Sequence, residues 1–408
     1  MSGYPINFYP RARFDTTVKE KIKIAHIITR LIIGGAQENT LITVNGLQNN
    51  PDYAATLISG PTYGPEGSLE SAARRVSPLV IIPALRRNIN PFHDARALLM
   101  LYRLLKKERF TIVHTHSSKA GILGRLAAKL AKTPYIVHTI HGMPFFKHQN
   151  HLKNFFYFLL EKTAAKWTDK IICVSQTLID DALQVRLAPR EKFVKIYSGI
   201  DTASFKKNPA CRSAVRKKLG ISGDSPVIGK IARLFPLKGQ DYLLAAAVKI
   251  IEKLPEAKIL LIGDGILKQS LRQTARRLGI ENNIIFAGLL PPQEIPDYLQ
   301  AIDVLAHTSL HEGLPRAVVQ GFAGGIPVVC FDTDGARDIV SNSINGYLVP
   351  AKNTDLLATR LIELLCDKDK AQRMGEAGEK LARELFDSQL MVRAIDGVYR
   401  EVMAPCGK

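Results

Sequence analysis

The chain has 408 residues, 46% of them hydrophobic and 23% charged, and its formal net charge at pH 7 is +19. This length is too great for a single hydrophobic core, so two or three domains are expected, and the composition is that of an ordinary globular protein. The five cysteines lie far apart, without a CxxC pair or a Cys/His cluster, which excludes a zinc motif and a disulfide framework and favours a reducing compartment.

The positive charge is concentrated in the first half of the chain. Residues 1–203 contain 28 Lys and Arg against 14 Asp and Glu, whereas residues 204–408 contain 28 against 23. A half this basic predicts an anionic partner: a phosphorylated substrate, an anionic lipid or a nucleic acid. Scattered, solvated surface lysines are the alternative.

The N-terminal segment is polar and charged and has no apolar signal core. The uncharged stretch from Ala317 to Phe331 is interrupted by Gly and Pro and is shorter than the roughly 20 residues of a membrane span. We therefore expect a cytoplasmic protein, with peripheral contact at the inner face of the cytoplasmic membrane as a further hypothesis.

Taken in chain order, β-rich runs alternate with helical patterns through the first 200 residues. We predict helices at 93–108 and 121–130 and strands at 23–28, 55–59, 79–82, 111–115, 135–140 and 170–175. Helix 93–108 is predicted to place Leu98, Leu99, Tyr102 and Leu105 on one face. This alternation is typical of a doubly wound parallel sheet, and it breaks near residue 200.

A second series begins at Val227, after a charged segment that contains Pro209. We predict strands from 227 and at 258–262, 283–286 and 304–308, with helices at 241–254, 267–278 and 293–300. The fold class is therefore α/β, with two Rossmann-like, doubly wound domains at 1–203 and 204–387, followed by a closing helix within 388–408.

Two stretches of the second series have the residue types of a ligand site. Arg233 and Lys238 bracket the turn after the first strand, where ligands of open α/β sheets bind, and two cations there suit a diphosphate. Glu312 lies in a loop with Gly313 and Pro315, ahead of a helical segment, which suits a ligand rich in hydroxyls. The alternatives are two solvated loop cations and an ordinary carboxylate stabilised by the helix dipole.

Glycines and histidines mark the corresponding places in the first half. Gly34 and Gly35 lie where backbone N–H groups can approach an anion, and His141 follows a strand and precedes a glycine, which lets a ligand come close. Gly263, in IGDG, fits a tight turn beside the crevice; the third glycine of an NAD fingerprint is missing, so NAD binding is rejected. Asp332-Thr333-Asp334 spells DxD, but a turn is favoured over a metal site.

The basic, aromatic segment 148–160, HQNHLKNFFYFLL, has two interpretations. It predicts a surface helix that lies on a membrane or on a lipid-linked acceptor. Alternatively, Phe155, Phe156 and Leu159 belong to the core, since Phe and Leu at helical spacing usually do.

Taken together, these motifs resemble the retaining glycosyltransferases of family four, which have the two-domain GT-B fold. The resemblance runs from Lys23 to Met403 and is carried by GGAQ, HTHSSKAG, HG, KIICVS, SGID, ARLFPLKG, IGDG, HEGLP and GIPVV, in this order. It implies a central cleft between the domains, a C-terminal helix that packs back on the first domain, and a nucleoside-diphosphate sugar as donor.

The resemblance also implies roles for residues at the matching positions. Arg233 and Lys238 would bind the donor diphosphate, and Glu312 would contact sugar hydroxyls. The sugar and phosphate would be cradled by Gly313, Leu314 and Pro315, with Gly34, Gly35 and Gly263 as further donor-binding positions. His141 would face the sugar near the reaction centre.

One position departs from the family pattern. Gln320 stands where the second Glu of the family motif binds the ribose of the nucleotide, and an amide can still bond to hydroxyls. We therefore expect altered ribose contact or donor affinity.

The resemblance implies hexosyl transfer without a metal or cofactor to a glycan or a polyprenyl-diphosphate-linked acceptor in cell-surface polysaccharide synthesis. The competing hypotheses are a GT-B nucleotide-sugar epimerase, against which the EGLP segment argues, and a basic nucleic-acid-binding protein, which no recognised module supports. No nucleic-acid partner is expected.

Overall fold

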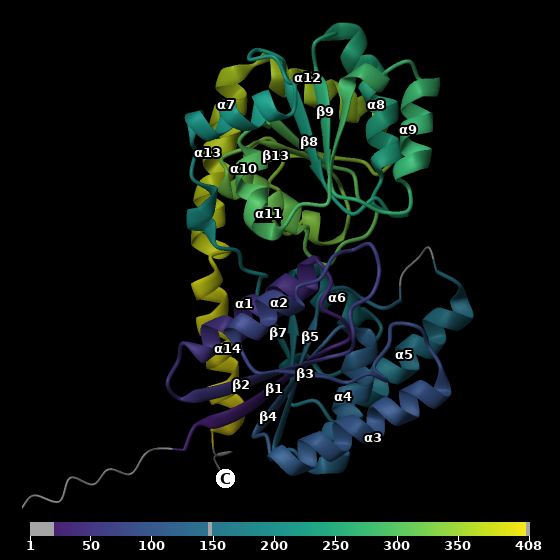
Figure 1. Cartoon of the computed structure of the whole chain (residues 1–408), viewed down its shortest axis with the longest axis vertical. Coiled ribbons are helices and arrows are strands. Elements are labelled where there is room, and N and C mark those ends of the chain that lie inside the picture. The colour runs from purple at the N-terminus through teal and green to yellow at the C-terminus, as the bar shows by residue number, and fades with distance from the viewer. Residues whose placement is uncertain (1–19, 146–148, 405–408) are drawn as a thin grey trace, which may run out of the picture.

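The computed structural model describes residues 20–145 and 149–404, and the strands in this part of the chain form two sheets. The first has the strand order β3-β2-β1-β4-β5-β6-β7 and the second β10-β9-β8-β11-β12-β13 (Figure 1). Every pairing is parallel. In each sheet the order reverses beside the first strand, between β1 and β4 and between β8 and β11, and such reversals open a ligand crevice at the carboxyl ends of the strands.

The first sheet is formed by residues 22–195. Its strands are β1 (Ile22–Ile28), β2 (Tyr53–Ser59), β3 (Leu79–Ile81), β4 (Ile112–His116), β5 (Tyr135–Ile140), β6 (Lys170–Cys173) and β7 (Phe193–Lys195). The helices around it are α1 (Gly35–Gln48), α2 (Glu70–Val76), α3 (Pro91–Glu108), α4 (Ser118–Ala131), α5 (His151–Lys166) and α6 (Gln176–Gln184). Both faces of the sheet are covered, so the central strand β4 is buried along its whole length.

Local chemistry explains why α3 begins two residues before its predicted start. The Asn90 side chain accepts a hydrogen bond from the His93 N–H at 3.0 Å, and Pro91 occupies the first turn, where its missing N–H costs nothing. The helix ends at Glu108, and the next residue, Arg109, adopts a left-handed conformation with φ 53°.

The second sheet is formed by residues 227–349. Its strands are β8 (Val227–Ile231), β9 (Lys258–Ile262), β10 (Ile284–Gly288), β11 (Val304–His307), β12 (Val328–Phe331) and β13 (Gly346–Val349). The helices of this half are α7 (Pro209–Lys218), α8 (Gln240–Lys253), α9 (Lys268–Arg277), α10 (Ile295–Leu299), α11 (Arg316–Ala323), α12 (Thr354–Cys366) and α13 (Lys368–Leu385). The predicted fold class, two Rossmann-like domains, is confirmed; the boundaries after residues 203 and 387 stay predictions.

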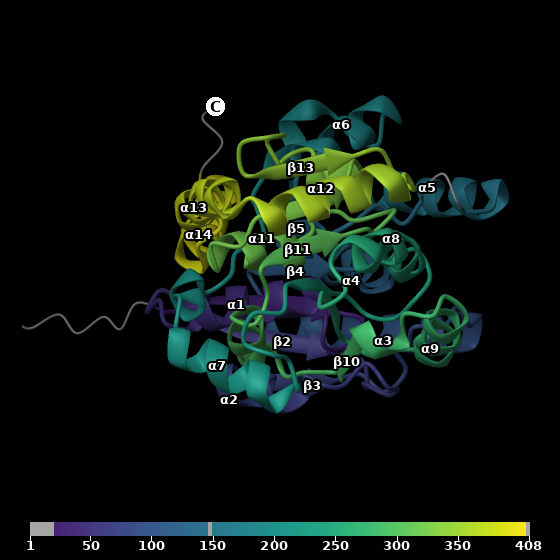
Figure 2. The same cartoon turned by 90° about the horizontal axis from the view of Figure 1, so that it is seen from above.

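The C-terminal helix α14 (Ser388–Met403) returns to the first domain, as predicted. It runs down beside α1 and β2 in Figure 1, and Figure 2 shows it in line with α13. Its apolar face, which includes Met391, Ile395 and Tyr399, is buried in the same hydrophobic cluster as residues of β1 and β2. The helix therefore links the two halves of the fold through the core of the first.

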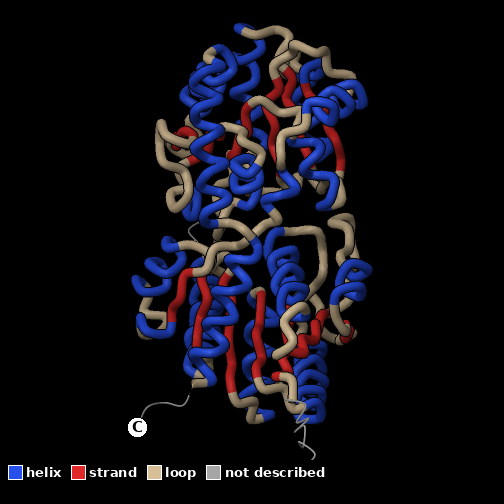
Figure 3. The backbone as a smooth tube through the Cα atoms, turned by 90° about the vertical axis from the view of Figure 1, so that its left-hand side faces the viewer, coloured by secondary structure: helices blue, strands red, loops and turns tan. Residues whose placement is uncertain are grey.

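The two domains meet directly through the loops at the carboxyl ends of their strands (Figure 3). The Asp338 carboxylate accepts hydrogen bonds from the backbone N–H and hydroxyl of Thr177 in α6, at 3.2 and 2.6 Å. Across the same interface, Arg316 donates to the carbonyl of Gly199 at 3.0 Å. These contacts join the two domains beside the cleft.

The structure of helix α5 shows that one of the two interpretations of its sequence, the core interpretation, is wrong. Phe155 is 66% exposed, and Phe156 and Leu159 are also exposed, so they are not core residues. The helix packs through Ala164, Ala165 and Glu161 instead, and the Glu161 carboxylate lies 2.6 Å from the buried Arg125 guanidinium. Helical spacing could not reveal this, because apolar residues occur on both faces. Among the described helices, none is long and apolar enough to cross a membrane.

Candidate active site

A cavity of about 720 Å³ lies between the carboxyl ends of the two sheets. It brings together nearly all the residues that the sequence singled out, from both halves of the chain. The predicted site residues that line it are Gly34, Gly35, His141, Arg233, Lys238, Gly263, Glu312, Leu314 and Gln320. Gly313 and Pro315 are buried beside it, Gly313 against the backbone of His141 and Pro315 at the start of α11.

The predicted diphosphate and sugar ends of the site are adjacent. Lys238, in the turn after β8, donates from Nζ to Oε1 of Glu312 at 2.6 Å. The turn itself is fixed by Gln240, whose side chain donates to the carbonyl of Arg233 at 2.8 Å. The Arg233 guanidinium lies 3.8 Å from the carboxylate of Glu66, which comes from the first domain. Arg233 therefore reaches across the cleft.

Glu312 is held as a carboxylate. Burial alone would raise its pKa, but the Lys238 ammonium, together with hydrogen bonds from Lys238 and Ser309, lowers the pKa to about 2. The group is thus ionised at neutral pH, when it can accept hydrogen bonds from ligand hydroxyls.

A buried lysine, Lys230, lies near this pair. Lys230 in β8 donates to the Thr308 hydroxyl at 2.8 Å, and that hydroxyl donates to the carbonyl of Gly239 at 2.5 Å. Burial, with the nearby Lys238 charge, lowers the pKa of Lys230 to about 7. Sequence reasoning missed Lys230, because it looks like one polar residue in a buried strand.

Three further cations line the cavity and were not predicted: Arg30, Arg87 and Arg316. Arg30 and Arg87 lie 3.4 and 3.9 Å from the Glu66 carboxylate, and Arg316 lies 3.3 Å from Glu38. For Arg30 and Arg87 the only sequence signal was the basic balance of the first half, whereas Arg316 directly follows the HEGLP segment. Together with Arg233 and Lys238 they give the cavity five basic side chains, a composition that suits an anionic ligand.

His141 lies at the domain interface, at the end of β5. A Cβ atom on Gly313 would lie 2.0 Å from the carbonyl oxygen of His141, so the loop after β11 approaches this backbone as only glycine allows. Burial and the positive charge of Arg316 lower the pKa of His141 to about 3. The imidazole is therefore neutral at pH 7.

The three remaining predicted glycines shape the walls of the cavity. Gly263 has φ 132°, and a Cβ there would lie 2.1 Å from the carbonyl oxygen of Ala232, which supports the tight-turn interpretation of IGDG. Gly34 precedes the first turn of α1, and Gly35 packs against the Arg316 side chain. The start of α1 therefore lies at the cavity.

The DxD segment leads into the short turn η5 (Asp334–Ala336), and the Asp332 carboxylate lies 2.5 Å from Nε of Arg337. Both observations favour the turn over a metal site. In the described part of the chain, the one group with metal-ligand spacing is His26, His114 and His116, below the cavity.

The buried histidines predict acid-sensitive folding. The pKa values of His26, His141 and His307 are lowered from 6.5 to about 3, in each case chiefly by burial. Between pH 6.5 and pH 3 the unfolded chain therefore binds more protons than the folded protein. The unfolding free energy is at its full value above pH 6.5 and decreases as pH falls towards 3. Each such histidine should cost about 1 to 2 kcal/mol of unfolding free energy between pH 7 and pH 5.

Urea unfolding at pH 7 and pH 5, at one ionic strength, measures this loss. The unfolding free energy should fall at pH 5, and substitution of the exposed His151 by Ala should leave the difference unchanged. Equal stability at the two pH values would contradict the assignment of neutral, buried histidines.

Comparison with known proteins places this geometry among sugar-transferring enzymes. Residues 33–204 match the family model Glycosyltransferase Family 4, and residues 212–381 match Glycosyl transferases group 1. The chain is 32% identical, over 85% of its length and 89% of the relative's, to UDP-Gal:alpha-D-GlcNAc-diphosphoundecaprenol alpha-1,3-galactosyltransferase of Escherichia coli. It is 25% identical to the capsular polysaccharide biosynthesis glycosyltransferase CapM of Staphylococcus aureus, over 78% of this chain and 84% of CapM.

Solved structures agree on the fold. Anabaena HepE in complex with UDP-glucose superposes with a TM-score of 0.81 at 22% identity, over 93% of this chain and 99% of that one. WaaG, a glycosyltransferase involved in lipopolysaccharide biosynthesis, superposes with a TM-score of 0.74 at 16% identity, over 92% of this chain and 99% of WaaG.

Proposed function

The chain belongs to the group 1 glycosyl transferases of family 4, and from this membership we propose that it transfers a hexose from a UDP-sugar to a polyprenyl-diphosphate-linked glycan, with retention of anomeric configuration. The observation that carries the proposal is the cavity between the domains, where Arg233 and Lys238 lie beside the ionised Glu312. The UDP donor and lipid-linked acceptor are supported by the name of the E. coli relative.

The proposed chemistry is electrostatic. As the bond between sugar and phosphate breaks, the sugar becomes oxocarbenium-like and negative charge develops on the departing UDP. Arg233 and Lys238 would stabilise that charge at the end of β8, without reorganising, because the turn already fixes them. Glu312 would accept hydrogen bonds from sugar hydroxyls, and neutral His141 would contact the sugar near the reacting carbon.

The carboxylates of the cavity favour a same-face reaction over a protein nucleophile. Within the described lining, they are Glu38 and Glu312. The first lies 3.3 Å from Arg316 and the second 2.6 Å from Lys238. Ion pairs of this kind make both groups poor nucleophiles, so the acceptor hydroxyl would attack from the side that UDP leaves.

Gln320 is the position at which donor affinity should be adjustable. It is buried at the cavity, on α11, where the family pattern has a glutamate that binds the ribose. A carboxylate can accept hydrogen bonds from two hydroxyls, whereas in an amide only the oxygen accepts and the nitrogen donates. Gln320→Glu is therefore expected to lower the KM for the donor by about three- to tenfold with kcat nearly unchanged. An unchanged KM in steady-state kinetics would remove Gln320 from the ribose site.

The acceptor side of the proposal is supported by the surface of the first domain. Leu152 is 80% exposed, and the apolar residues of α5 lie beside exposed lysines such as Lys153 and Lys166. Helix α5 projects from the edge of the molecule in Figures 1 and 2. An exposed helix face of this composition suits an anionic bilayer, where a polyprenyl-linked acceptor would be embedded.

The decisive experiment for the proposed function combines a donor panel with two acceptors. Nucleoside-diphosphate sugars are screened by thermal stabilisation, and the best donor is then assayed with a polyprenyl-diphosphate-linked sugar and with a soluble analogue of it. UDP-hexoses should stabilise the protein most, and transfer should require the lipid-linked acceptor. Donor epimerisation in the absence of acceptor, or no stabilisation by any UDP-sugar, would overturn the proposal.

Vesicle sedimentation tests the membrane contact separately. Phe155→Ser should reduce binding to anionic vesicles several-fold, because it removes an exposed anchor. Ile344→Ser is the matched control, since Ile344 is equally exposed, at 63%, but lies in the second domain. Equal binding by both variants would exclude α5 as the contact surface.

A further inference from the structure

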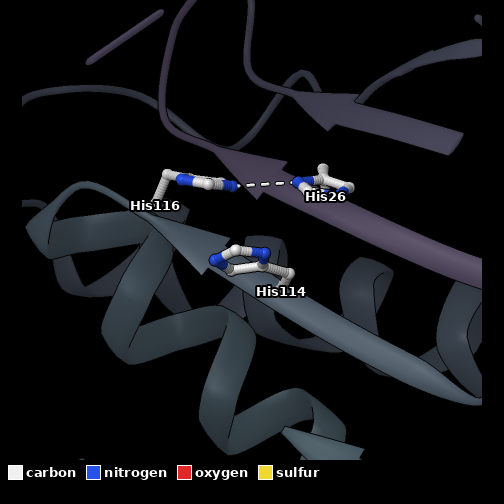
Figure 4. A group of neighbouring side chains, drawn as sticks. All are labelled: His26, His114 and His116. Atoms are coloured by element: carbon white, nitrogen blue, oxygen red, sulfur yellow. Dashed lines mark hydrogen bonds between the residues drawn. The ribbon is translucent and has the colours of Figure 1, made fainter. Parts of the chain in front are cut away.

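Below the cavity, buried side chains form an unbroken series of contacts that ends at His141. Figure 4 shows its central part: His26 from β1 and His116 from β4 point at one another, with His114 beneath them. Nδ1 of His26 lies 3.0 Å from Nε2 of His116, and Nδ1 of His116 lies 3.2 Å from Nε2 of His141. His26, His114 and His116 are at most 1% exposed.

The series continues away from the cavity to the C-terminal helix. Nε2 of His26 lies 3.2 Å from the hydroxyl of Tyr399, which lies 2.6 Å from Nδ1 of His114. Nε2 of His114 lies 2.7 Å from the hydroxyl of Thr139. Five contacts of hydrogen-bond length therefore join six side chains, from Thr139 through Tyr399 to His141.

This arrangement is better described as a hydrogen-bonded chain than as a metal site. The ligand nitrogens of His26, His114 and His116 lie within 4.8 Å of one another, which alone would permit an ion. However, both ring nitrogens of each histidine already have partners in the chain. The rings of His114 and His116 are also stacked, with centroids 4.4 Å apart, whereas metal ligands direct their lone pairs at a common point.

The hydrogen-bonded chain of side chains has two self-consistent arrangements of its hydrogens. A neutral imidazole has one N–H and one bare nitrogen, and a hydroxyl has one hydrogen, so His114, Tyr399, His26 and His116 each donate once and accept once within the chain only if all five bonds point the same way. Either every bond runs from His141 towards Thr139, and Nδ1 of His141 is bare, or every bond is reversed and Nδ1 carries a hydrogen. Any mixture leaves either a ring nitrogen or the hydrogen of the buried Tyr399 hydroxyl without a hydrogen bond in the chain, which is costly.

The requirement that all four histidines be neutral is met. Burial lowers the pKa of His26 and of His141 to about 3, and the pKa values of His114 and His116 lie well below 6.5 for the same reason. The distances also favour one direction. The shorter contact of the Tyr399 hydroxyl, to His114, suits O–H donation, and the longer one suits donation by His26.

We propose that Tyr399, His26 and His116 are positioning residues that fix the tautomer of His141, so that its Nδ1 is a bare acceptor at the sugar site. The step from tautomer to catalysis rests on the proposed function; the tautomer itself does not. Because Tyr399 belongs to the C-terminal helix, the hydrogen-bonded chain couples the docking of that helix to the protonation of Nδ1 of His141 in the active site.

Removal of the Tyr399 hydroxyl tests the proposal. Tyr399→Phe keeps the buried ring but leaves the chain without its central link. The ¹⁵N NMR signals of the His141 ring, assigned with a His141→Gln variant, should change from the Nε2–H tautomer to a mixture. We expect kcat to fall about tenfold, the worth of one hydrogen bond, with little change in the KM for the donor.

The matched control is Tyr53→Phe. Tyr53 is also buried, packs edge-on against Tyr399 and bonds to Asp396 of the same helix, yet it lies outside the chain. It should lower stability without moving the His141 signals. If Tyr399→Phe fails to fold, Thr139→Val is the second variant. It removes the hydroxyl that pairs with Nε2 of His114, and a bare nitrogen is easier to leave unpaired there than an N–H. The bonds of the chain should therefore reverse, which also shifts the tautomer of His141.

Unchanged His141 signals in the folded Tyr399 or Thr139 variant would overturn the proposal, as would equal changes in the Tyr53 control. Because the NMR measurement needs no substrate, it gives its answer even if the protein proves not to transfer sugar from UDP. A changed tautomer with an unchanged kcat would contradict only the second part of the proposal, that the tautomer of His141 matters for catalysis.

Discussion

Substitution of Arg233 or Lys238 by alanine is expected to reduce kcat for sugar transfer by about 10²- to 10³-fold, which is the usual effect of removing one preorganised partner of a developing negative charge. Both side chains lie at the carboxyl end of β8, in a turn that Gln240 fixes through the carbonyl of Arg233. Their charges act most strongly when UDP departs, so the loss should appear in kcat and in kcat/KM together.

The two variants should differ in one respect. Lys238→Ala also removes the 2.6 Å partner of Glu312, so the carboxylate loses the charge that lowers its pKa and should contact the sugar less well. Arg233→Ala breaks a longer ionic contact, 3.8 Å, with Glu66 and leaves the Lys238–Glu312 pair in place. Lys238→Ala is therefore expected to have the larger effect.

Lys249→Ala is the control for these substitutions. Lys249 also belongs to the second domain and also pairs with a carboxylate, that of Asp355, but both side chains are exposed and lie outside the cavity. Steady-state kinetics should show wild-type turnover for Lys249→Ala. Near-wild-type turnover in Arg233→Ala or Lys238→Ala, with the folded state intact, would remove that residue from the diphosphate site.

Gly313→Ala is expected to lower kcat/KM by about 10²-fold or more, because catalysis is sensitive to a misplacement of about 1 Å. The added Cβ would lie 2.0 Å from the His141 carbonyl oxygen, and this is a contact between the two domains. Backbone atoms cannot rotate away as a side chain could, so the domains must separate. His141 would then move away from Glu312 and Lys238.

A second glycine provides the control, because it shows whether any glycine-to-alanine substitution lowers activity or only the one at Gly313. Gly397, in α14, has nothing within 4 Å of the position of an added Cβ. Gly397→Ala should retain activity and gain up to about 1 kcal/mol of stability from helix propensity. If Gly313→Ala retained full activity, the close approach of the two domains would be unnecessary for transfer.

The sequence predicted those features that depend on order along the chain. Strands alternating with helices, and a break near residue 200, led to two doubly wound sheets, because parallel strands need helical crossovers. Since ligands bind at the carboxyl ends of such strands, motifs after β5, β8 and β11 could be expected to meet, and His141, Lys238 and Glu312 do line one cavity.

What the sequence did not predict are contacts between segments far apart that have no shared motif. Glu66 lies in a loop of the first domain, and nothing in its neighbourhood indicates that Arg30, Arg87 and Arg233 converge on it. Tyr399 looks like one aromatic residue of a closing helix, yet its hydroxyl lies between His26 and His114. Such partners are set by the docking of whole elements, which periodicity does not specify.

Solvent exposure was also ambiguous where a helix is apolar on more than one face. Phe155 of α5 and Leu101 of α3 occur in similar helical patterns, but the first is 66% exposed and the second is fully buried. The difference arises because α3 lies against α4 and the sheet along its apolar face, whereas α5 packs through its small residues Ala164 and Ala165.

The stereochemistry of the product tests the central claim most directly. An α-linked UDP-hexose is incubated with the lipid-linked acceptor, and the new anomeric linkage is read by ¹H NMR from its coupling constant. A cleft whose lining carboxylates are paired, with cations placed to surround the departing diphosphate, predicts an α-linked product. A β-linked product would show attack from the opposite face and would contradict the account.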